Sequence, residues 1–299
     1  MSVLLYEKKG RIAYLTLNRP EKRNALSYEL LGELEKAWID FRDDDDLWVA
    51  VLTGAGISAE SGIPTFRGED GLWRNYRAEQ LATPEAFAAQ PEIVWEWYRW
   101  RRSIISQAQP NAAHRALVEL ERLSPEFLLI TQNVDNLHRR AGSESIVELH
   151  GNIFGERCSE EGVVVETEAS ADESLNRCSC GALLRPDVVW FGEMLPPEAL
   201  ERAFNAARRC DLMLVVGTSA LVQPAASIPL IAKESGAYVV EINRDPTPIS
   251  TLVDDSILGL AGEVLPQLIA HLSADSPGAQ RAPDRNETLR HNASPDAGE

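Results

Sequence analysis

The stretch that decides the fold is GAGISAESGIPTFRG, Gly54–Gly68, which directly follows the apolar run WVAVLT at Trp48–Thr53. A short apolar run that ends at glycine is typical of a buried parallel strand. Gly54 and Gly56 allow a tight turn in which backbone N–H groups approach a pyrophosphate, and a helix that begins there directs its N-terminus at the anion. The stretch therefore predicts a dinucleotide-binding loop, although glycines at such a turn also occur for structural reasons alone.

Strand-like and helix-like stretches alternate along the rest of the chain. The further candidate strands are Phe127–Thr131, Val188–Phe191, Leu212–Gly217 and Tyr238–Ile242, and the candidate helices include Ala112–Leu123 and Glu198–Arg209. This alternation predicts an α/β, Rossmann-like, doubly wound parallel sheet, which binds ligands at the carboxyl ends of its strands. We assign this domain to residues 48–272. A small zinc-ribbon-like module is inserted at about 152–186, where the alternation breaks.

The two ends of the chain follow other patterns. Val3–Tyr6 and Ile12–Asn18 alternate apolar and polar residues around a Lys-Gly turn, which predicts a β-hairpin. Tyr28–Phe41 follows at helical spacing, so residues 1–47 are expected to form an extra hairpin and helix. Residues 273–299 are rich in Pro, Asp, Asn, Ala and Arg and are expected to be disordered.

Composition restricts the partners. The net charge of the chain is −17. The resulting electrostatic field repels nucleic acid and attracts a cationic, lysine-bearing peptide. The N-terminus lacks a secretory pattern and no apolar run could span a bilayer, so we expect no membrane partner. Three of the four cysteines cluster, which suits a metal in a reducing compartment better than disulfides. We therefore expect a cytoplasmic protein, and the sequence does not determine its oligomeric state.

The glycine-rich stretch resembles the signature loop of the sirtuins, and other sirtuin-like motifs follow it in order. They are TQNVD at Thr131–Asp135, LHG at Leu149–Gly151, RPDVVWFGEMLP at Arg185–Pro196, GTS at Gly217–Ser219 and the pair Ile242-Asn243. The resemblance covers roughly residues 51–272, and chance agreement over so many ordered motifs is remote. It implies an NAD-dependent protein-lysine deacylase that acts on acyl-lysine proteins or peptides.

The resemblance also assigns roles to the matched positions. The implied NAD-binding residues are Gly54, Ala55, Gly56, Ser58, Ala59, Ser61, Thr65, Phe66, Arg67, Trp73, Gln132, Asn133, Val134, Asp135, Gly217, Thr218, Ser219, Asn243 and, as a weaker match, Ala261. The implied catalytic residues are His150, Asn133 and Asp135, and Val189, Phe191 and Gly192 would contact the substrate.

In the implied mechanism the acyl-lysine amide oxygen attacks the anomeric carbon as nicotinamide leaves. His150 then helps a ribose hydroxyl attack the imidate carbon, because a histidine titrates near neutrality and can take that proton. The products are lysine, nicotinamide and O-acyl-ADP-ribose. Each of these residues also has a purely structural interpretation. His150 would cap a strand end, and Asn133 and Asp135 would shape the turn after a strand.

Tyr98 and Arg101 stand three residues apart in WEWYRWRR, so they share one face of a helix. This pair resembles the acyl-pocket pair of sirtuins that remove malonyl, succinyl or glutaryl groups. A guanidinium matches a carboxylate bidentately, and a tyrosine hydroxyl adds a donor. We therefore expect acidic acyl groups, and acetyl as well, to be removed. In the structural alternative, the arginine is simply exposed on an aromatic-rich core helix. The corresponding functional alternative is plain deacetylation.

The cysteine pattern departs from the two C-x-x-C pairs that hold zinc in the family. Glu161 stands where a second cysteine is expected after Cys158, and the other half is C-x-C, at Cys178 and Cys180. Three cysteines could hold zinc with a carboxylate or water as the fourth ligand. Alternatively, the module contains no metal and is held by packing. Cys210 stands apart and is predicted to be a small buried core residue.

Residues 1–53 resemble the start of a crotonase, an enoyl-CoA hydratase-like enzyme, with LNRP at Leu17–Pro20 and NALS at Asn24–Ser27. The fragment stops before the oxyanion-hole glycines and acidic residues that crotonase chemistry requires, so we expect no such catalysis. This foreign start leaves a second class of function open. The chain would then be a non-catalytic module that binds NAD or ADP-ribose, or a chimera with impaired activity.

Overall fold

The computed structural model describes residues 4–9, 12–17, 48–64, 72–73, 76–165 and 175–274. Three predictions therefore fall outside the described residues. They concern the helix at Tyr28–Phe41, the loop residues Thr65, Phe66 and Arg67, and the tail beyond residue 274.

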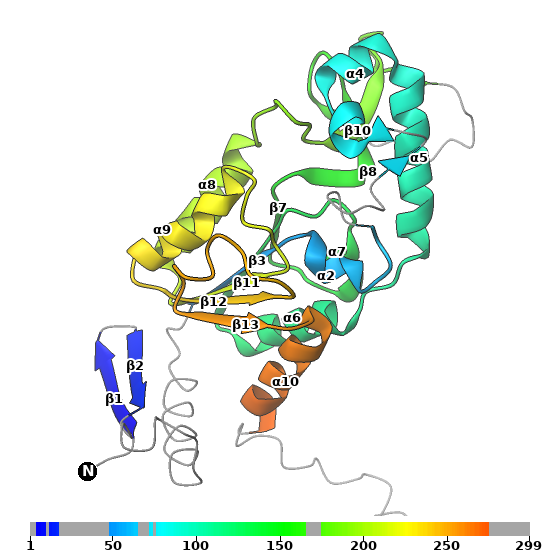
Figure 1. The fold of residues 1–299 in the computed structure, drawn as a ribbon. Coiled ribbons are helices and arrows are strands. Elements are labelled where there is room, and N and C mark those ends of the chain that lie inside the picture. Colours follow the sequence, from blue (N-terminus) through cyan, green and yellow to red (C-terminus); the bar gives the residue numbers. More distant parts are fainter. Residues whose placement is uncertain are drawn as a thin grey trace, which may run out of the picture.

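The central sheet has six strands in the spatial order β13-β12-β11-β3-β6-β7 (Figure 1). The strands are β3 (Trp48–Thr53), β6 (Glu126–Thr131), β7 (Ile146–Glu148), β11 (Leu212–Val216), β12 (Tyr238–Asn243) and β13 (Asp255–Leu258). Every neighbouring pair runs parallel. The chain continues first to one side of β3 and later to the other, so a topological switch point lies at β3. The predicted doubly wound α/β sheet is confirmed.

Alternate side chains of β3 enter two separate cores. Ala50 and Leu52 pack with α8 (Pro197–Arg209), η3 (Ala225–Ser227) and α9 (Ile228–Glu234) on one face. Val49 and Val51 pack with α6 (Ala112–Leu123) and α10 (Ala261–Ala274) on the other. Side chains of a strand point to opposite faces in turn, so an uninterrupted apolar run requires helices on both sides. Figure 1 shows these helices on either side of the sheet.

A second, smaller unit packs above the carboxyl edge of the sheet in Figure 1. Its strands β8 (Gly151–Cys158), β9 (Val164–Val165) and β10 (Leu184–Val188) form a sheet in the order β10-β8-β9. Its helices are α3 (Ala78–Leu81), α4 (Pro84–Ala89) and α5 (Pro91–Gln107). An aromatic core joins helices to strands through Phe87, Trp95, Trp97, Tyr98 and Trp190. The remaining elements are α2 (Ala55–Ala59), β4 (Leu72–Trp73), β5 (Tyr76–Arg77) and α7 (Leu137–Ala141).

The predicted strand Val188–Phe191 is wrong. β10 ends at Val188 and belongs to the small sheet, and the next residues form a turn. Two of their backbone N–H groups bond outside the central sheet. Phe191 N donates to the Ala82 carbonyl oxygen at 2.9 Å, and Trp190 N donates to the Glu193 carboxylate at 2.8 Å. Val188 and Trp190 are apolar because they belong to the aromatic core, whereas Val189 packs against the core of the central sheet and Phe191 is exposed.

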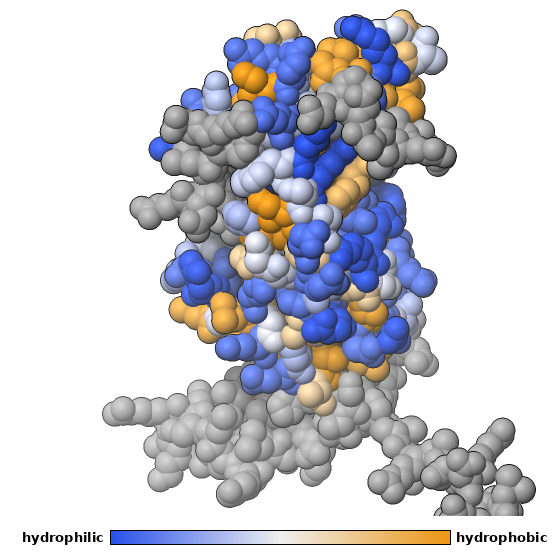
Figure 2. Space-filling view, turned by 90° about the vertical axis from the view of Figure 1, so that its right-hand side faces the viewer, coloured by the Kyte–Doolittle hydropathy of each residue, from blue (hydrophilic) through white to orange (hydrophobic). Residues whose placement is uncertain are grey.

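The N-terminal hairpin is confirmed as an antiparallel pair of β1 (Leu4–Lys9) and β2 (Ile12–Leu17), with Leu4 opposite Leu17. It forms a two-stranded sheet of its own. Among the described residues, no helix has both the length and the apolar composition to cross a membrane. Figure 2 shows one face as a mosaic of hydrophilic and hydrophobic patches, which is ordinary for a surface in contact with water.

Two strand-to-helix turns interlock through glycine. Gly54 N donates to the Val216 carbonyl oxygen at 3.0 Å, and Gly56 N donates to the Gly217 carbonyl oxygen at 2.8 Å. Gly217 adopts a φ of +62°, and a Cβ placed on it would lie 2.5 Å from Ile57 N. Contacts this short between backbones leave no space for a side chain, so glycine is required on both turns.

We expect Gly217→Ala to lower the free energy of unfolding by about 2–4 kcal/mol, because left-handed strain and a backbone clash add together. Gly162→Ala is the matched control, since Gly162 has a φ of +68° and nothing within 4 Å of its Cβ position. Urea denaturation of both variants measures the difference. Equal losses of stability would mean that the strained φ alone, and not the interlock, requires glycine.

Candidate functional site

The carboxyl ends of the strands bring the predicted NAD-binding residues together. Gln132, after β6, donates from Nε2 to Thr218 Oγ1, after β11, at 2.9 Å. Asn243, at the end of β12, donates from Nδ2 to the Thr218 carbonyl oxygen at 2.8 Å. Three strand ends are therefore joined by side-chain hydrogen bonds beside the glycine interlock. This edge is where open α/β sheets bind ligands.

Asn133 and Asp135 are both buried beneath the glycine-rich turn. Asn133 Nδ2 donates to the Gly54 carbonyl oxygen and to Ser58 Oγ, each at 3.1 Å. Asp135 Oδ1 accepts from Leu137 N at 2.9 Å. Burial raises the pKa of Asp135, while its hydrogen bonds from Leu137 and Ser58 and the nearby Arg101 oppose that rise. These contacts hold both side chains in single orientations at the base of the site.

His150 precedes β8 and is half-buried. Its Nδ1 lies 2.8 Å from the Gln132 carbonyl oxygen. Because a carbonyl only accepts, Nδ1 carries the hydrogen and Nε2 keeps a free lone pair. Burial lowers the pKa of His150, and the hydrogen bond to Gln132 opposes this only in part. The ring is therefore neutral near pH 7, as a general base must be.

A buried pair of histidines lies under the site, and the sequence did not predict it. His138 Nε2 is 3.0 Å from Thr53 Oγ1, which donates to Thr131 Oγ1 at 2.9 Å. The His114 ring lies 4.8 Å from the His138 ring, and its Nε2 is 3.5 Å from Ser58 Oγ. Both rings are neutral, since burial lowers the pKa of His114 to about 4 and holds that of His138 well below its usual range. The network supports Asn133 from below, because Thr131 Oγ1 accepts from Asn133 N.

Helix α5 carries the predicted acyl-binding pair. Tyr98 is fully buried and its hydroxyl accepts from Trp190 Nε1 at 2.8 Å. Arg101 is half-buried on the same helix, close enough to Tyr98 and Asp135 for both to raise its pKa against the effect of burial. Arg102 has another role, since it donates to the Ile153 carbonyl oxygen and pairs with Glu156. Arg99 lies over the Trp95 ring at 5.7 Å.

The other predicted residues occupy varied positions around this edge. Val189 N donates to the His150 carbonyl oxygen at 2.9 Å, which ties the predicted substrate segment to the base. Phe191 is exposed, and Gly192 has a positive φ of 88°. Ala261 is buried in the core that contains Ile57, so it packs against α2. The remaining predicted residues lie as follows: Ala55 and Ser61 half-buried, Ala59 and Ser219 exposed, Val134 buried, and Trp73 in β4.

Cys158, Glu161, Cys178 and Cys180 offer ligand atoms that all lie within 4.8 Å of one another. Cys158 Sγ is 3.5 Å from Cys180 Sγ, and Cys178 Sγ is 3.7 Å from Glu161 Oε2. Bond lengths of about 2.3 Å to sulfur and about 2.1 Å to oxygen separate the ligands of tetrahedral zinc by roughly 3.5–3.8 Å. The cluster therefore fits zinc. Cys210 is buried in the main core, as predicted.

A separate cavity of about 560 Å³ opens at the opposite, amino edge of β3 and β6. Its lining includes Trp48, Glu126, Phe127, Arg202 and Asn205. None of the residues around it belongs to the predicted site. The candidate site is therefore located by the polar side chains that converge at the carboxyl edge of the sheet, and not by the volume of a cavity.

Two families match the chain. The Sir2 family matches residues 54–224, and the enoyl-CoA hydratase/isomerase family matches residues 7–62, so the two matches overlap at 54–62. The NAD-dependent protein deacylase 1 of Archaeoglobus fulgidus is 54% identical over 227 residues, which are 75% of this chain and 93% of that protein. The NAD-dependent protein deacylase of Pyrococcus furiosus is 56% identical over 228 residues, or 74% of this chain and 91% of that protein.

Solved structures agree with these relatives. A Sir2 homologue in complex with NAD is 51% identical and superposes with a TM-score of 0.75, over 82% of this chain and 95% of that one. A Sir2 protein in complex with a p53 peptide and NAD⁺ is 33% identical, with a TM-score of 0.70 over 80% of this chain and 98% of that one. The Sir2 family match at residues 54–224 contains the glycine-rich turn, Arg101 and His150, whereas Asn243 and Ala261 lie beyond it.

The buried histidines predict a pH-dependent stability. The pKa of His114 is about 4 in the folded chain and about 6.5 when unfolded, so unfolding takes up a proton between these values. Stability should be complete above pH 6.5 and decline as the pH falls toward 4, by up to about 1.4 kcal/mol per pH unit. Urea denaturation across this range measures the slope. His114→Gln should reduce the slope, and the contribution of His138, whose pKa burial also lowers, should remain. An unchanged slope would contradict the assignment.

Proposed function

Because the chain belongs to the Sir2 family and is an NAD-dependent protein deacylase, we propose that it removes acidic acyl groups, succinyl and malonyl, and also acetyl, from lysine side chains of proteins or peptides. The products would be lysine, nicotinamide and O-acyl-ADP-ribose. The observation that carries the proposal is the pairing of Tyr98 with Arg101 on one face of α5. The net charge of −17 also favours a cationic, lysine-bearing substrate.

The environment of the pair favours a carboxylate ligand. A half-buried guanidinium has lost part of its hydration, which a bidentate carboxylate would replace. Tyr98 keeps its proton, because burial raises its pKa to about 12, so its hydroxyl is available as a donor. An acetyl group offers no charge to either side chain. Acetyl-lysine would therefore be accepted as a smaller substrate, without the added contact.

NAD would be held at the carboxyl edge of the sheet by the glycine-rich turn, by Gln132, Asn133 and Asp135, and by Gly217–Ser219 with Asn243. It supplies an electrophilic ribose carbon and nicotinamide as the leaving group. Asn133 and Asp135 enter the site already fixed by Ser58 and Leu137, so little side-chain entropy is lost on binding.

His150 would act as the general base through Nε2, which takes a proton from a ribose hydroxyl. Its Nδ1 hydrogen bond to Gln132 sets both the tautomer and the direction of Nε2. The lowered pKa keeps this nitrogen unprotonated at neutral pH. Val189 N donates to the His150 carbonyl oxygen, so the base and the proposed peptide-binding residues Val189, Phe191 and Gly192 move as one unit.

We assign the catalytic domain to residues 48–272 and regard residues 1–47 as an addition without a catalytic role. All four cysteines are free, which supports a reducing compartment, and we propose the cytoplasm. A module that binds NAD without turnover is not favoured, since the described catalytic residues are all present and mutually supported.

Turnover of matched succinyl-, malonyl- and acetyl-lysine peptides with NAD, followed by mass spectrometry, tests the proposed specificity. Arg101→Met should lower kcat/KM for succinyl-lysine by about tenfold or more, since a hydrogen-bonded charge pair is lost. Acetyl-lysine turnover should stay within about twofold. Arg99→Met is the matched control, because Arg99 is a neighbour on the same helix and lies over Trp95.

Equal loss on the succinyl and acetyl peptides would contradict a contact between Arg101 and the acyl carboxylate. A wild-type enzyme that turns over acetyl-lysine but neither acidic peptide would overturn the acidic-acyl proposal as a whole. His150→Ala should abolish formation of free lysine from every peptide, because all of them share the same base.

Zinc would be held by Cys158, Cys178 and Cys180, and we propose that Glu161 is the fourth ligand. Its Oε2 is 3.7 Å from Cys178 Sγ, a separation that suits two ligands of one tetrahedral ion. The cluster connects the end of β8 to the segment before β10, so zinc would stabilise the small unit.

Glu161→Gln should weaken zinc retention by roughly ten- to a hundredfold, as changes near a bound metal commonly do. Glu160→Gln is the matched control, since this neighbouring exposed carboxylate is not part of the cluster. Competition with a chromogenic chelator, with zinc counted by mass spectrometry, gives the affinities. Equal affinities for both variants would mean that water, and not Glu161, completes the site.

A further inference from the structure

We propose that Trp190 is a positioning residue that sets the preference for acidic acyl groups by orienting the Tyr98 hydroxyl. This inference rests on the proposed function, since it concerns the pocket that would hold the acyl carboxylate. Trp190 lies in the turn after β10, and Tyr98 lies on α5. The two residues are 92 positions apart in sequence and meet only in the folded chain.

The hydrogen bond between them leaves one orientation for the tyrosine proton. Trp190 Nε1 lies 2.8 Å from Tyr98 Oη, and an indole N–H can only donate. Tyr98 Oη is therefore the acceptor, and its own proton points away from Trp190. Both groups are buried, so water does not compete for the hydroxyl. A carboxylate only accepts, so a hydroxyl held in this way is prepared to donate to an acidic acyl group.

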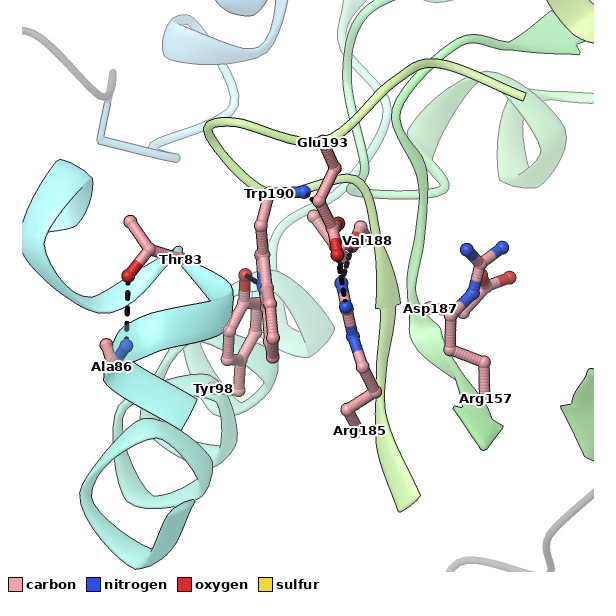
Figure 3. A network of polar contacts seen from close by, with 9 residues as sticks. All are labelled: Thr83, Ala86, Tyr98, Arg157, Arg185, Asp187, Val188, Trp190 and Glu193. Carbon is pink, nitrogen blue, oxygen red and sulfur yellow. Dashed lines mark hydrogen bonds and ion pairs between the residues drawn. The ribbon is translucent and has the colours of Figure 1, made fainter. Parts of the chain in front are cut away.

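Trp190 is itself held on three sides (Figure 3). The Arg185 guanidinium lies 3.3 Å from the centre of its ring. The Phe87 ring, which Figure 3 does not draw, lies 5.3 Å away on a tilted plane. Its backbone N–H donates to Glu193 Oε2 at 2.8 Å. Two nitrogens of Arg185 bind the two oxygens of the same Glu193 carboxylate. The indole is thus fixed before any ligand arrives.

The same contacts join two parts of the site. Arg185 also donates to the Val188 carbonyl oxygen at 2.7 Å, at the start of the segment that contains Val189 and Phe191. The turn at residues 189–193 is therefore folded around Arg185, with Trp190 as its connection to α5. Substrate residues bound along this turn and an acyl group bound at Tyr98 would be aligned by one rigid network. An arginine and a tyrosine on α5 would not achieve this alone.

Trp190→Phe tests the role, because it removes the indole N–H and retains an aromatic ring next to Arg185 and Phe87. We expect KM for a succinyl-lysine peptide to rise by about five- to tenfold, while kcat and all constants for the acetyl-lysine peptide stay within about twofold. In a Tyr98→Phe background the same change should add less than about twofold, because the hydroxyl that Trp190 orients is already absent.

Phe87→Leu is the matched control. It removes the ring contact between Phe87 and the indole and should lower the thermal midpoint, but it leaves Nε1 in place and should not alter the ratio of succinyl to acetyl turnover. If Trp190→Phe does not fold, benzothienylalanine at position 190 replaces N–H by sulfur at nearly constant shape and gives the same measurement. Equal losses on both peptides, or losses that multiply with Tyr98→Phe, would overturn the inference.

The experiments distinguish failure of the inference about Trp190 from failure of the proposed acidic-acyl specificity. A wild-type enzyme without activity on succinyl-lysine contradicts the acidic-acyl specificity itself. A wild-type enzyme with that activity, together with a Trp190→Phe variant of unchanged KM, contradicts only the role of Trp190.

Discussion

The site depends on the close approach of two backbones at Gly56 and Gly217. Gly56 N donates to the Gly217 carbonyl oxygen at 2.8 Å, and a Cβ on either residue would overlap the other turn. This contact draws the ends of β3 and β11 together at the point where the order of strands reverses. Gly54, Thr218 and the side chains that bond to them are positioned as a consequence. The hydrophobic cores on both faces of the sheet hold the strands, but the glycine contact sets the geometry at their ends.

Under this contact lies a buried layer of polar groups that hold one another. Thr53, Thr131 and His138 form a chain of side-chain contacts, and Asn133 completes it by bonding to Thr131, Gly54 and Ser58. Buried polar groups are costly unless they are paired, so such a layer tolerates few alternative arrangements. Asn133 and Asp135 are therefore fixed by the fold itself. The low pKa values of His114 and His138 follow from the same burial.

Aromatic and cationic side chains hold the small unit together and connect it to the proposed acyl pocket. Arg185 holds Glu193 and stacks on Trp190, and Trp190 reaches Tyr98 on α5. Helix α5 carries arginines at positions 99, 101 and 102. Arg102 supports β8, because it donates to the Ile153 carbonyl oxygen and pairs with Glu156. Arg101 instead lies near Tyr98 and Asp135. The proposed acyl pocket and the proposed base are thus connected, because Val189 N, next to Trp190, donates to the His150 carbonyl oxygen.

The sequence by itself determined the four inner strands β12, β11, β3 and β6 of the central sheet, because apolar runs carry a local signal that needs no tertiary information. It did not predict the edge strands β7 and β13. Helix Ala112–Leu123 and strand Trp48–Thr53 were predicted with the boundaries they have in the structure. The order of motifs also identified the family, on which the proposed roles of His150 and Asn133 rest. Only the tertiary structure showed that Val189–Phe191 leaves the sheet, that His114 and His138 meet, and that Trp190 bonds to Tyr98. The physical reason is that these features depend on contacts between residues far apart in the chain, and such contacts leave no periodic pattern in the sequence.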